Sequence, residues 1–440
     1  MTHPQDLTLR EQAAAVRRGD LDASELLAVT LARIGERDQE LNSTPVVFAD
    51  SSRAMLADAP EGPLHGVPVT VKDMFALPWR GAYNGTPFEL FPAAPSGPFR
   101  RLHDAGAVVV GVANQHELGM GSTGTTSAYG PMANPWDLAQ CAGGSSGGSA
   151  AGVAARLVAA SLASDSGGST RLPAAYCGVV GLKLTYGSLP YDGYFGIGTT
   201  FSAPGVVSRD GADARLIAEA LLDRKLPPGD GSRLRVGVVS HPFWDDVDPD
   251  VAGLCDTAVR AAGWPVREMV LEHLELAGTA TFVRLIAEAG IPPPAVLAGL
   301  SSPTRAVLLA GLLVPARLVP RADRVRAAVR RSVAAAFASV DILAWPASPA
   351  PAPPLADTWV TLPSGRVPAD GPNVRQASLA NLCGLPGISL PVGLHPSGLP
   401  VGLQLLAPWG EEGRLIDAAE HLEHATGRSH VDLVPPIARD

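Results

Sequence analysis

The chain has 440 residues, of which 46% are hydrophobic and 18% are charged, a balance that excludes disordered and fibrous proteins and indicates a compact globular one. Its net charge of −9 gives no electrostatic reason to expect a nucleic-acid partner, so we expect a small-molecule partner and no nucleic acid. The N-terminus shows no secretory signal, and charged residues or prolines interrupt the apolar runs at 150–163 and 306–319. We therefore expect a cytoplasmic protein with no membrane contact.

The first 60 residues are predicted to form an outer helical layer. Apolar residues recur at intervals of three and four over residues 7–19 and 24–41, with Ser24 as the expected N-cap of the second helix. Between residues 64 and 189, strand-like runs alternate with Gly/Ser-rich loops, which is typical of an α/β protein with a buried sheet. These runs are VPVTV, AVVVGVA and YCGVVGLKL, and the segment SAAGVAARLVAASL between the last two is predicted to be a helix.

The second half of the chain repeats this alternation around a long helical stretch. A strand (235–240) and a helix (248–263) precede helical sequence from residue 271 to 339. Strands follow at 341–347, 387–393 and 402–408, and the last helix spans 414–427. The Pro-rich segment 346–357 is interpreted as an extended surface connector because strand-like sequence flanks it.

We predict one continuous domain, because no linker or internal repeat divides the chain. Its parts are an N-terminal helical layer (1–60), a core (61–210), a variable, mainly helical region (230–340) and a C-terminal return to the sheet (341–440). The four cysteines form no CxxC pair and have no histidine at metal-ligand spacing, so we expect reduced thiols, no metal and no cofactor. These cysteines are Cys141, Cys177, Cys255 and Cys383.

Lysine is rare in this chain, which uses arginine as its ordinary cation. Of 34 basic residues only Lys72, Lys183 and Lys225 are lysines, and the first two lie in apolar runs. A guanidinium keeps its proton in a protein, whereas a desolvated ammonium can lose it. Lys72 and Lys183 are therefore candidates for proton transfer.

The segment from Cys141 to Gly187 carries two Gly-Gly-Ser turns, GGSSGGS and SDSGGSTR, one on each side of the Ala-rich run. Glycines let a substrate approach the main chain closely, and consecutive N–H groups in such a turn can converge on one oxyanion. Together with segments 66–73, 117–137 and 381–408, these turns resemble the amidase signature family over residues 20 to 425. The resemblance implies an α/β fold with a large, mixed, twisted β-sheet covered on both sides by helices.

The same resemblance implies a Ser-cisSer-Lys triad. Ser169 would be the nucleophile, Ser145 the bridging serine after a cis peptide bond that follows Gly144, and Lys72 the base. A serine hydroxyl attacks an amide only if its proton is removed, and a lysine can remove it only when burial lowers its pKa. Lys72 ends an apolar strand, which meets that requirement.

The remaining site residues are assigned on the same motifs. The oxyanion hole is predicted from the backbone N–H groups of Ser166, Gly167, Gly168 and Ser169. Ser146, Asp165 and Arg171 are assigned supporting roles, and Lys183 that of a buried hydrogen-bond donor. Candidates for the substrate pocket are Met120, Gly121, Ser122 and Thr123. Specificity is expected in the stretch 271–339 and in the loops 120–129 and 191–201, whose apolar character favours an uncharged or aromatic acyl amide.

Other interpretations of these motifs are weaker. GGSSG also fits the serine elbow of α/β-hydrolases, which would need one of the downstream histidines His395, His421 or His424 as its partner. The GxGxxG match at Gly119 lacks a preceding strand, and the glycine-rich loop lacks the GK[ST] ending of a P-loop.

The sequence thus predicts an amidase that cleaves a small carboxylic amide through an acyl-enzyme, acting alone or as a homodimer. Two alternatives stay open, the A subunit of a glutamine-dependent tRNA amidotransferase and a binding protein that only retains the fold.

Overall fold

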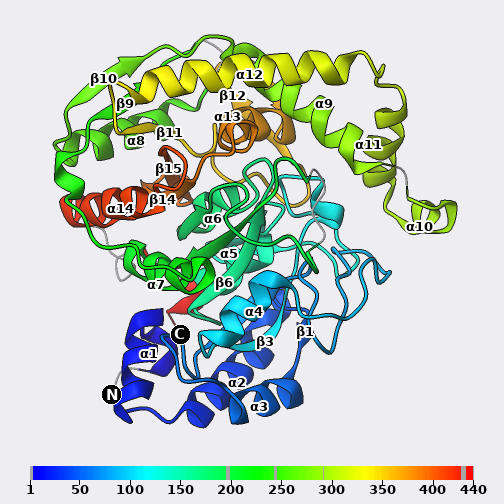
Figure 1. Ribbon diagram of the computed structural model, residues 1–440, viewed down its shortest axis with the longest axis vertical. Helices are drawn as coiled ribbons and strands as arrows, with labels where there is room; N and C mark the ends of the chain where they lie inside the picture. The colour runs from blue at the N-terminus through cyan, green and yellow to red at the C-terminus, as the bar shows by residue number, and fades with distance from the viewer. Residues whose placement is uncertain (1–2, 195–198, 242–244, 291, 428–432, 440) are drawn as a thin grey trace.

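The computed structural model describes residues 3–194, 199–241, 245–290, 292–427 and 433–439, and its centre is a mixed sheet of eleven strands. The strand order is β1-β3-β2-β6-β8-β7-β14-β15-β11-β9-β10 (Figure 1). The bounds are β1 Val46–Val47, β2 Pro68–Lys72, β3 Val108–Ala113, β6 Ala160–Asp165, β7 Val180–Lys183, β8 Ala203–Ser208, β9 Val236–Val239, β10 Val266–Met269, β11 Ile342–Pro346, β14 Gly387–Leu394 and β15 Pro400–Leu406. One sheet thus joins strands from both ends of the chain.

Helices cover both faces of this sheet, as the resemblance implied. The bounds are α1 Leu9–Arg18, α2 Ala23–Leu41, α3 Ala49–Ala57, α4 Gly97–Asp104, α5 Gly147–Ala154, α6 Arg171–Cys177, α7 Gly211–Leu222, α8 Pro249–Ala261, α9 Ala277–Ala289, α10 Pro294–Gly299, α11 Ser302–Leu312, α12 Leu318–Phe337, α13 Asp370–Cys383 and α14 Glu412–Thr426. Helices α4, α7, α8 and α14 pack on one face, and α2, α5 and α6 on the other. Over the distal strands, α9, α12 and α13 share a separate core with β11.

The alternation of side chains along β2 determines the face of the sheet to which the Lys72 side chain points. Val69 and Val71 belong to the core beneath α4, α7 and α14. Because successive side chains in a strand point to opposite faces, Lys72 must point away from that core, toward the side of α5 and α6. A buried cation is thereby placed among the two Gly-Gly-Ser turns.

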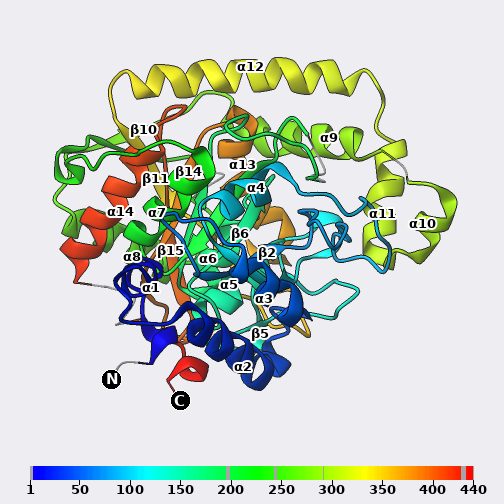
Figure 2. The same cartoon turned by 60° about the horizontal axis from the view of Figure 1, so that its bottom comes forward.

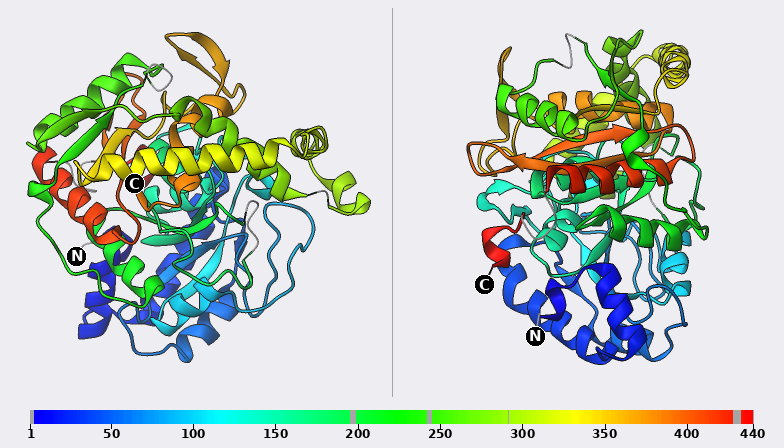
Figure 3. Two further views of the ribbon diagram at one scale, coloured as in Figure 1. Left: turned by 45° about the horizontal axis from the view of Figure 1, so that its top comes forward. Right: turned by 90° about the vertical axis from the view of Figure 1, so that its left-hand side faces the viewer.

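Helices α9 to α12 form an arm along one edge of the molecule. Helix α12 lies across the top of the view in Figures 1 and 2, and α10 and α11 project beyond the body in Figure 3. This arm corresponds to the helical stretch predicted at 271–339. No helix in the described ranges is long and apolar enough to cross a membrane.

Two predicted elements differ from the structure at their boundaries. The N-cap of α2 is Asp22 and not Ser24, because the Asp22 carboxylate accepts the backbone N–H groups of Ser24 and Glu25. The helix predicted over 149–162 ends at Ala154, and the last residues of that predicted range belong to strand β6. Small apolar residues fit both a buried helix and a buried strand, so periodicity did not separate the two.

The Pro-rich segment was wrongly interpreted as a surface connector. Ala347, Ser348, Ala350 and Ala352 are buried, and Cys141 donates its backbone N–H to the carbonyl of Pro353. The segment leads into a hairpin that sequence analysis missed, formed by β12 (Trp359–Leu362) and β13 (Gly365–Pro368). A short strand pair, β4 (Ala133–Asn134) with β5 (Asp137–Cys141), precedes the first Gly-Gly-Ser turn.

Candidate active site

The sheet brings the two halves of the site together through neighbouring parallel strands. Strand β2 pairs with β6 in parallel, with Thr70 opposite Ser161. Carboxyl ends of parallel strands meet at one edge of a sheet, so Lys72 at the end of β2 and Asp165 at the end of β6 lie at the same edge. The turn that follows Asp165 carries Ser169, and the loop before α5 carries Ser145.

Lys72 contacts two serine hydroxyls inside the protein. Its side chain is 1% exposed, and Nζ lies 2.6 Å from Ser145 Oγ and 3.0 Å from Ser164 Oγ. Burial lowers the pKa of Lys72 to about 7, with the Asp165 carboxylate acting in the opposite direction. A large fraction of this amine is therefore neutral near pH 7 and able to accept a proton.

Ser145 follows a cis peptide bond after Gly144, as the resemblance implied. Its side chain is buried, and its carbonyl accepts the backbone N–H of His116 at 3.0 Å. The next residue, Ser146, donates its backbone N–H to the carbonyl of Ser169 at 3.1 Å and its hydroxyl to the carbonyl of Ser164 at 3.1 Å. Ser146 thus links the two Gly-Gly-Ser turns through hydrogen bonds.

Ser169 is partly exposed, unlike its two predicted partners. Within the described residues its hydroxyl makes no hydrogen bond, so the second contact of the relay, from Ser169 to Ser145, is not formed here. Catalytic hydrogen bonds are often long without substrate and shorten in the complex. Its hydroxyl is accessible and lies near a buried amine, an arrangement in which a serine can act as a nucleophile.

Asp165 and Arg171 hold in place the turn that carries Ser169. The Asp165 carboxylate accepts the backbone N–H groups of Gly168 at 2.7 Å and Thr170 at 3.2 Å, and both carboxylate oxygens lie 3.0 Å from the Arg171 guanidinium. Arg171 also contacts Asn381 and Gln404. Burial would raise the pKa of the Asp165 carboxyl, but Arg171 outweighs burial and holds this pKa below its usual range. Asp165 and Arg171 are therefore a charged pair at neutral pH.

The structure narrows the predicted oxyanion hole. The N–H of Gly168 is already donated to Asp165, so it is not free for a substrate oxygen as we had predicted. Over the described part of the chain, the N–H groups of Ser166, Gly167 and Ser169 have no acceptor, and these three stay candidates. Gly168 has φ 111°, and a Cβ there would overlap the Cβ of Ala377 on α13, so only glycine fits this position.

The predicted pocket residues form a loop that is tied to α13. Ser122 donates its backbone N–H and its hydroxyl to Asp370 Oδ1 at 2.7 and 2.6 Å. Thr123 Oγ1 lies 3.0 Å from Thr125 Oγ1. Gly121 lies against the imidazole of His116, and Met120 packs beside Leu118. Part of the other predicted pocket loop, residues 195–198, lies outside the described residues.

Sequence reasoning missed two residues of this site, Ser164 and His116. Ser164 shares Lys72 with Ser145, and its position just before Asp165 in the SDSGGS motif could have indicated it. His116 is buried, its pKa is lowered by burial, and its Nδ1 has no hydrogen-bond partner among the described residues. Nothing in the sequence around His116 marks it, because a lone histidine is more often structural than catalytic.

The structure also places Lys183, the four cysteines and the histidines proposed for a serine elbow. Lys183 donates to the carbonyls of Leu184 at 3.1 Å and Leu385 at 2.7 Å, which confirms it as a buried donor. All four cysteines are free and buried. Of the candidate histidines for a serine elbow, His421 contacts the carbonyl of Ala262 and His395 contacts Ser397, so neither serves Ser145 or Ser169.

Comparison with known proteins agrees with this geometry. The sequence profile described as Amidase matches residues 25–416. The chain therefore belongs to the amidase signature family. It is similar to the crystal structure of an amidase, with 31% identity, a TM-score of 0.89 and coverage of 95% of this chain and 99% of that one. It is also similar to 6-aminohexanoate cyclic dimer hydrolase, at 26% identity, a TM-score of 0.84 and coverage of 99% and 100%.

Curated relatives carry a different name. The chain is 32% identical to the A subunit of glutamyl-tRNA(Gln) amidotransferase from Methylococcus capsulatus, covering 95% of this chain and 97% of the relative. It is 34% identical to the protein of that name from Anaeromyxobacter sp. (strain K), covering 96% of each. These relatives are named as subunits of an amidotransferase of glutamyl-tRNA(Gln). Our expectation of a small-molecule partner, no nucleic acid and a possible homodimer was therefore wrong. The exclusion of nucleic acid rested on net charge averaged over the whole surface.

Proposed function

We propose that this chain cleaves a carboxamide through an acyl-enzyme on Ser169, with Ser145 and Lys72 as a proton relay. The observation that carries the proposal is the 2.6 Å contact between Lys72 Nζ and Ser145 Oγ, made by a buried amine whose pKa is lowered to about 7. A lysine that only contributed a charge would remain protonated and solvated. A neutral amine against a hydroxyl can accept its proton.

The relay would proceed in two balanced halves. Lys72 accepts the proton of Ser145 while Ser145 accepts that of Ser169, and Ser169 Oγ bonds to the amide carbon. The tetrahedral intermediate collapses as the C–N bond breaks, and the proton returns through Ser145 to the departing nitrogen. Water then repeats the sequence in the place of the amine, which releases the carboxylate and restores Ser169.

The backbone around Ser169 would stabilise the charge that develops on the carbonyl oxygen. The unused N–H groups of Ser166, Gly167 and Ser169 belong to a turn that Asp165 and Arg171 hold in place. A preorganised donor of this kind contributes on the order of 3 kcal/mol to the stability of the transition state. All three proposed catalytic side chains are present, which argues against a protein that only binds.

For the biological reaction, we propose that the chain is the ammonia-releasing subunit of a glutamine-dependent amidotransferase. The support is the similarity to the A subunit of glutamyl-tRNA(Gln) amidotransferase over nearly the full length of both chains. A second candidate, an amidase that acts without a partner, is favoured by the similarity to the amidase crystal structure. Both use the same chemistry at Ser169 and differ in what controls it.

Two measurements test these proposals. A fluorophosphonate probe should attach to Ser169 and not to the Ser169→Ala variant, as read by mass spectrometry; attachment to another side chain would refute the nucleophile. Ammonia release should be measured with L-glutamine and with a panel of simple amides, for the chain alone and with co-expressed partner subunits. Glutamine hydrolysis that depends on the partners supports the amidotransferase, whereas hydrolysis of simple amides by the chain alone, without use of glutamine, supports the second candidate.

A further inference from the structure

The outer face of α12 carries a row of arginines that make no hydrogen bond or ion pair with any described residue. Residues 317–337 contain six arginines and one aspartate, in a chain whose net charge is −9. At 100° per residue, four of these arginines fall within one stripe on the side opposite the buried residues Val329 and Val333. They are Arg317, Arg321, Arg324 and Arg331, all exposed.

The two other arginines of α12, Arg326 and Arg330, have structural roles, because both contact the body of the protein. Arg326 donates to the carbonyls of Leu382 and Thr200 and stacks over the ring of Phe201. Arg330 donates to the carbonyl of Cys383 and stacks over Trp409. The four outer arginines make no hydrogen bond or ion pair with any described residue. Helix packing therefore accounts for the inner two guanidinium groups and leaves the outer four unexplained.

The row continues into a basic depression at the C-terminal half of the helix. Arg331 lines this depression with Arg267 and His273, and Glu272 is the acidic residue among the lining side chains. Arg267 is exposed and also lacks a partner among the described residues. From Arg317 to Arg331 the row spans about 21 Å along the helix axis. Helix α12 itself runs along the outer edge of the molecule in Figure 2.

We propose that this face of α12 binds the phosphate backbone of an RNA. The proposal rests on the amidotransferase function proposed for this chain, whose relatives are named for a glutamyl-tRNA. Unpaired guanidinium groups on one helix face form the usual electrostatic site for a polyanion, and a phosphate accepts two hydrogen bonds from one guanidinium. An overall acidic chain can bind RNA only through such a local surface.

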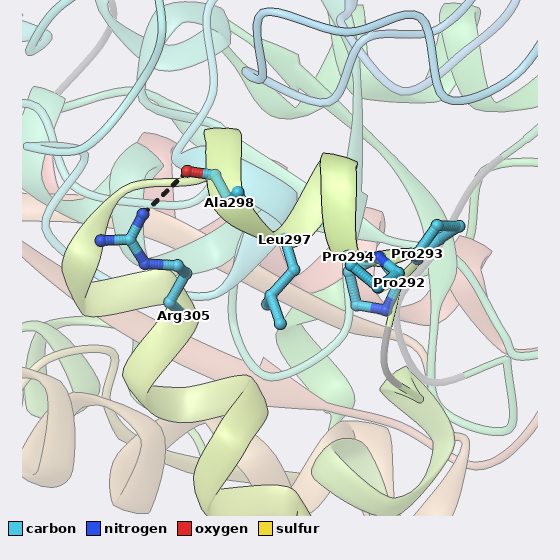
Figure 4. Close-up of a pocket in the computed structure, with 6 residues that line it drawn as sticks. All are labelled: Pro292, Pro293, Pro294, Leu297, Ala298 and Arg305. Carbon is cyan, nitrogen blue, oxygen red and sulfur yellow. Dashed lines mark hydrogen bonds between the residues drawn. The ribbon is translucent and has the colours of Figure 1, made fainter.

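An acidic protein fits this face less well than RNA does. The stripe also contains Ala328, between Arg324 and Arg331, and Ala335, one turn beyond Arg331. Their small side chains let a backbone approach but provide no anchor. Protein interfaces concentrate their binding energy in large apolar or aromatic residues at the centre. The strongly exposed Leu312 and Leu313 lie at the end of α11, before the row begins. The apolar depression of Figure 4, which Pro292, Leu297 and Arg305 help to line, likewise lies on α10 and α11.

Two triple variants with the same change in charge test the proposal in the full chain. The first is Arg321→Gln, Arg324→Gln and Arg331→Gln. The control is Arg18→Gln, Arg53→Gln and Arg233→Gln, three exposed arginines that each pair with a neighbouring carboxylate. The probe is fluorescein-labelled tRNA(Gln), titrated by fluorescence anisotropy at salt concentrations between about 50 and 200 mM.

We expect the α12 variant to bind tRNA at least tenfold more weakly than wild type, with the salt dependence reduced by about two to three phosphate contacts. The control variant should bind as wild type does. Absence of tRNA binding by wild type at low salt, equal binding by the two variants, or binding of poly-glutamate as tight as that of tRNA would each overturn the proposal. Ammonia release from glutamine without RNA, measured with the co-expressed partner subunits, should be the same in both variants and in wild type. Absence of ammonia release in all three proteins would count against the proposed function instead.

Discussion

Two buried lysines, Lys72 at the end of β2 and Lys183 at the end of β7, differ in what they touch and not in how acidic they are. Burial lowers the pKa of both to about 7. The partners of Lys72 are hydroxyls, which can donate as well as accept, whereas the partners of Lys183 are the carbonyls of Leu184 and Leu385, which only accept. Only Lys72 can exchange a proton with its neighbours.

The two lysines show that a shifted pKa does not by itself identify a base. Desolvation acts on any buried amine, so it produces the same shift at a structural and at a catalytic position. Geometry separates the two, because Lys72 reaches a serine beside the nucleophile turn and Lys183 fastens β7 to the start of β14. Variants of the two lysines and of the residues around them can test whether this difference decides their roles.

The largest effect on turnover is expected from replacing Lys72, with a Lys183 variant as the comparison. Lys72→Ala should lower kcat by on the order of 10⁴-fold or more, because the relay acts as a unit. Lys183→Met should change kcat less than tenfold while lowering the free energy of unfolding by about 1–3 kcal/mol, because two buried carbonyls lose their donor. Steady-state kinetics and urea denaturation on both variants measure this. Near-normal turnover in a folded Lys72→Ala variant would refute the base.

The next largest effect concerns the Asp165–Arg171 pair that holds the turn carrying Ser169. Asp165→Asn should lower the free energy of unfolding by about 3–5 kcal/mol, since Arg171 would then be a buried charge without a counterion. Asp50→Asn, which removes the partner of the exposed Arg53, is the matched control and should have little effect. Chemical denaturation of the two variants distinguishes them. Equal stability would mean that the Asp165–Arg171 pair does not hold the turn.

The pH dependence of turnover should show the lowered pKa of Lys72. The base is active when neutral, so kcat should rise roughly tenfold between pH 6 and pH 8 and level off above. The same rise should persist in Lys183→Met, although Lys183 has an equal pKa. A profile that falls over this range, or one that loses its rise in Lys183→Met, would transfer the role of base away from Lys72.

The smallest effect is expected at Ser164, the second partner of Lys72. Ser164→Ala removes a 3.0 Å acceptor of the amine but leaves its contact with Ser145, so kcat should fall about three- to tenfold. Ser161→Ala, on the same strand, removes a hydroxyl that faces Thr70 and should leave kcat unchanged. Stopped assays at pH 8 can resolve this difference. A loss as large as that of Lys72→Ala would make Ser164 a member of the relay.

The sequence was most informative where motif and chemistry coincided. The family resemblance placed the three proposed catalytic residues and the supporting Asp165 and Arg171, whose residue types suit one reaction. It also gave the fold class. Pattern was less informative for small apolar residues, and the helix predicted over 149–162 contains the start of β6 for that reason.

Other features depend on tertiary context that a linear pattern does not carry. The cap of α2 depended on which of two neighbouring polar residues had its oxygen within reach of the N–H groups, and Asp22 did. The donation of the Gly168 N–H to Asp165 depends on the fold of the turn. The arginines of α12 alternate in sequence with residues that face inward, and the sequence interpretation described the whole stretch 271–339 as apolar. The net charge of −9, summed over the whole chain, gave no sign of that local positive charge either.

The contact between Gly168 and Ala377 limits how this site can diverge. Because the turn and α13 already touch without a side chain at position 168, added bulk on either partner would displace the proposed nucleophile Ser169. Mutational libraries aimed at new substrates should leave this pair intact and vary the rim around Ser122 and Thr123. Diversity among descendants of this protein should be concentrated at that rim, while the glycine beneath the nucleophile stays fixed.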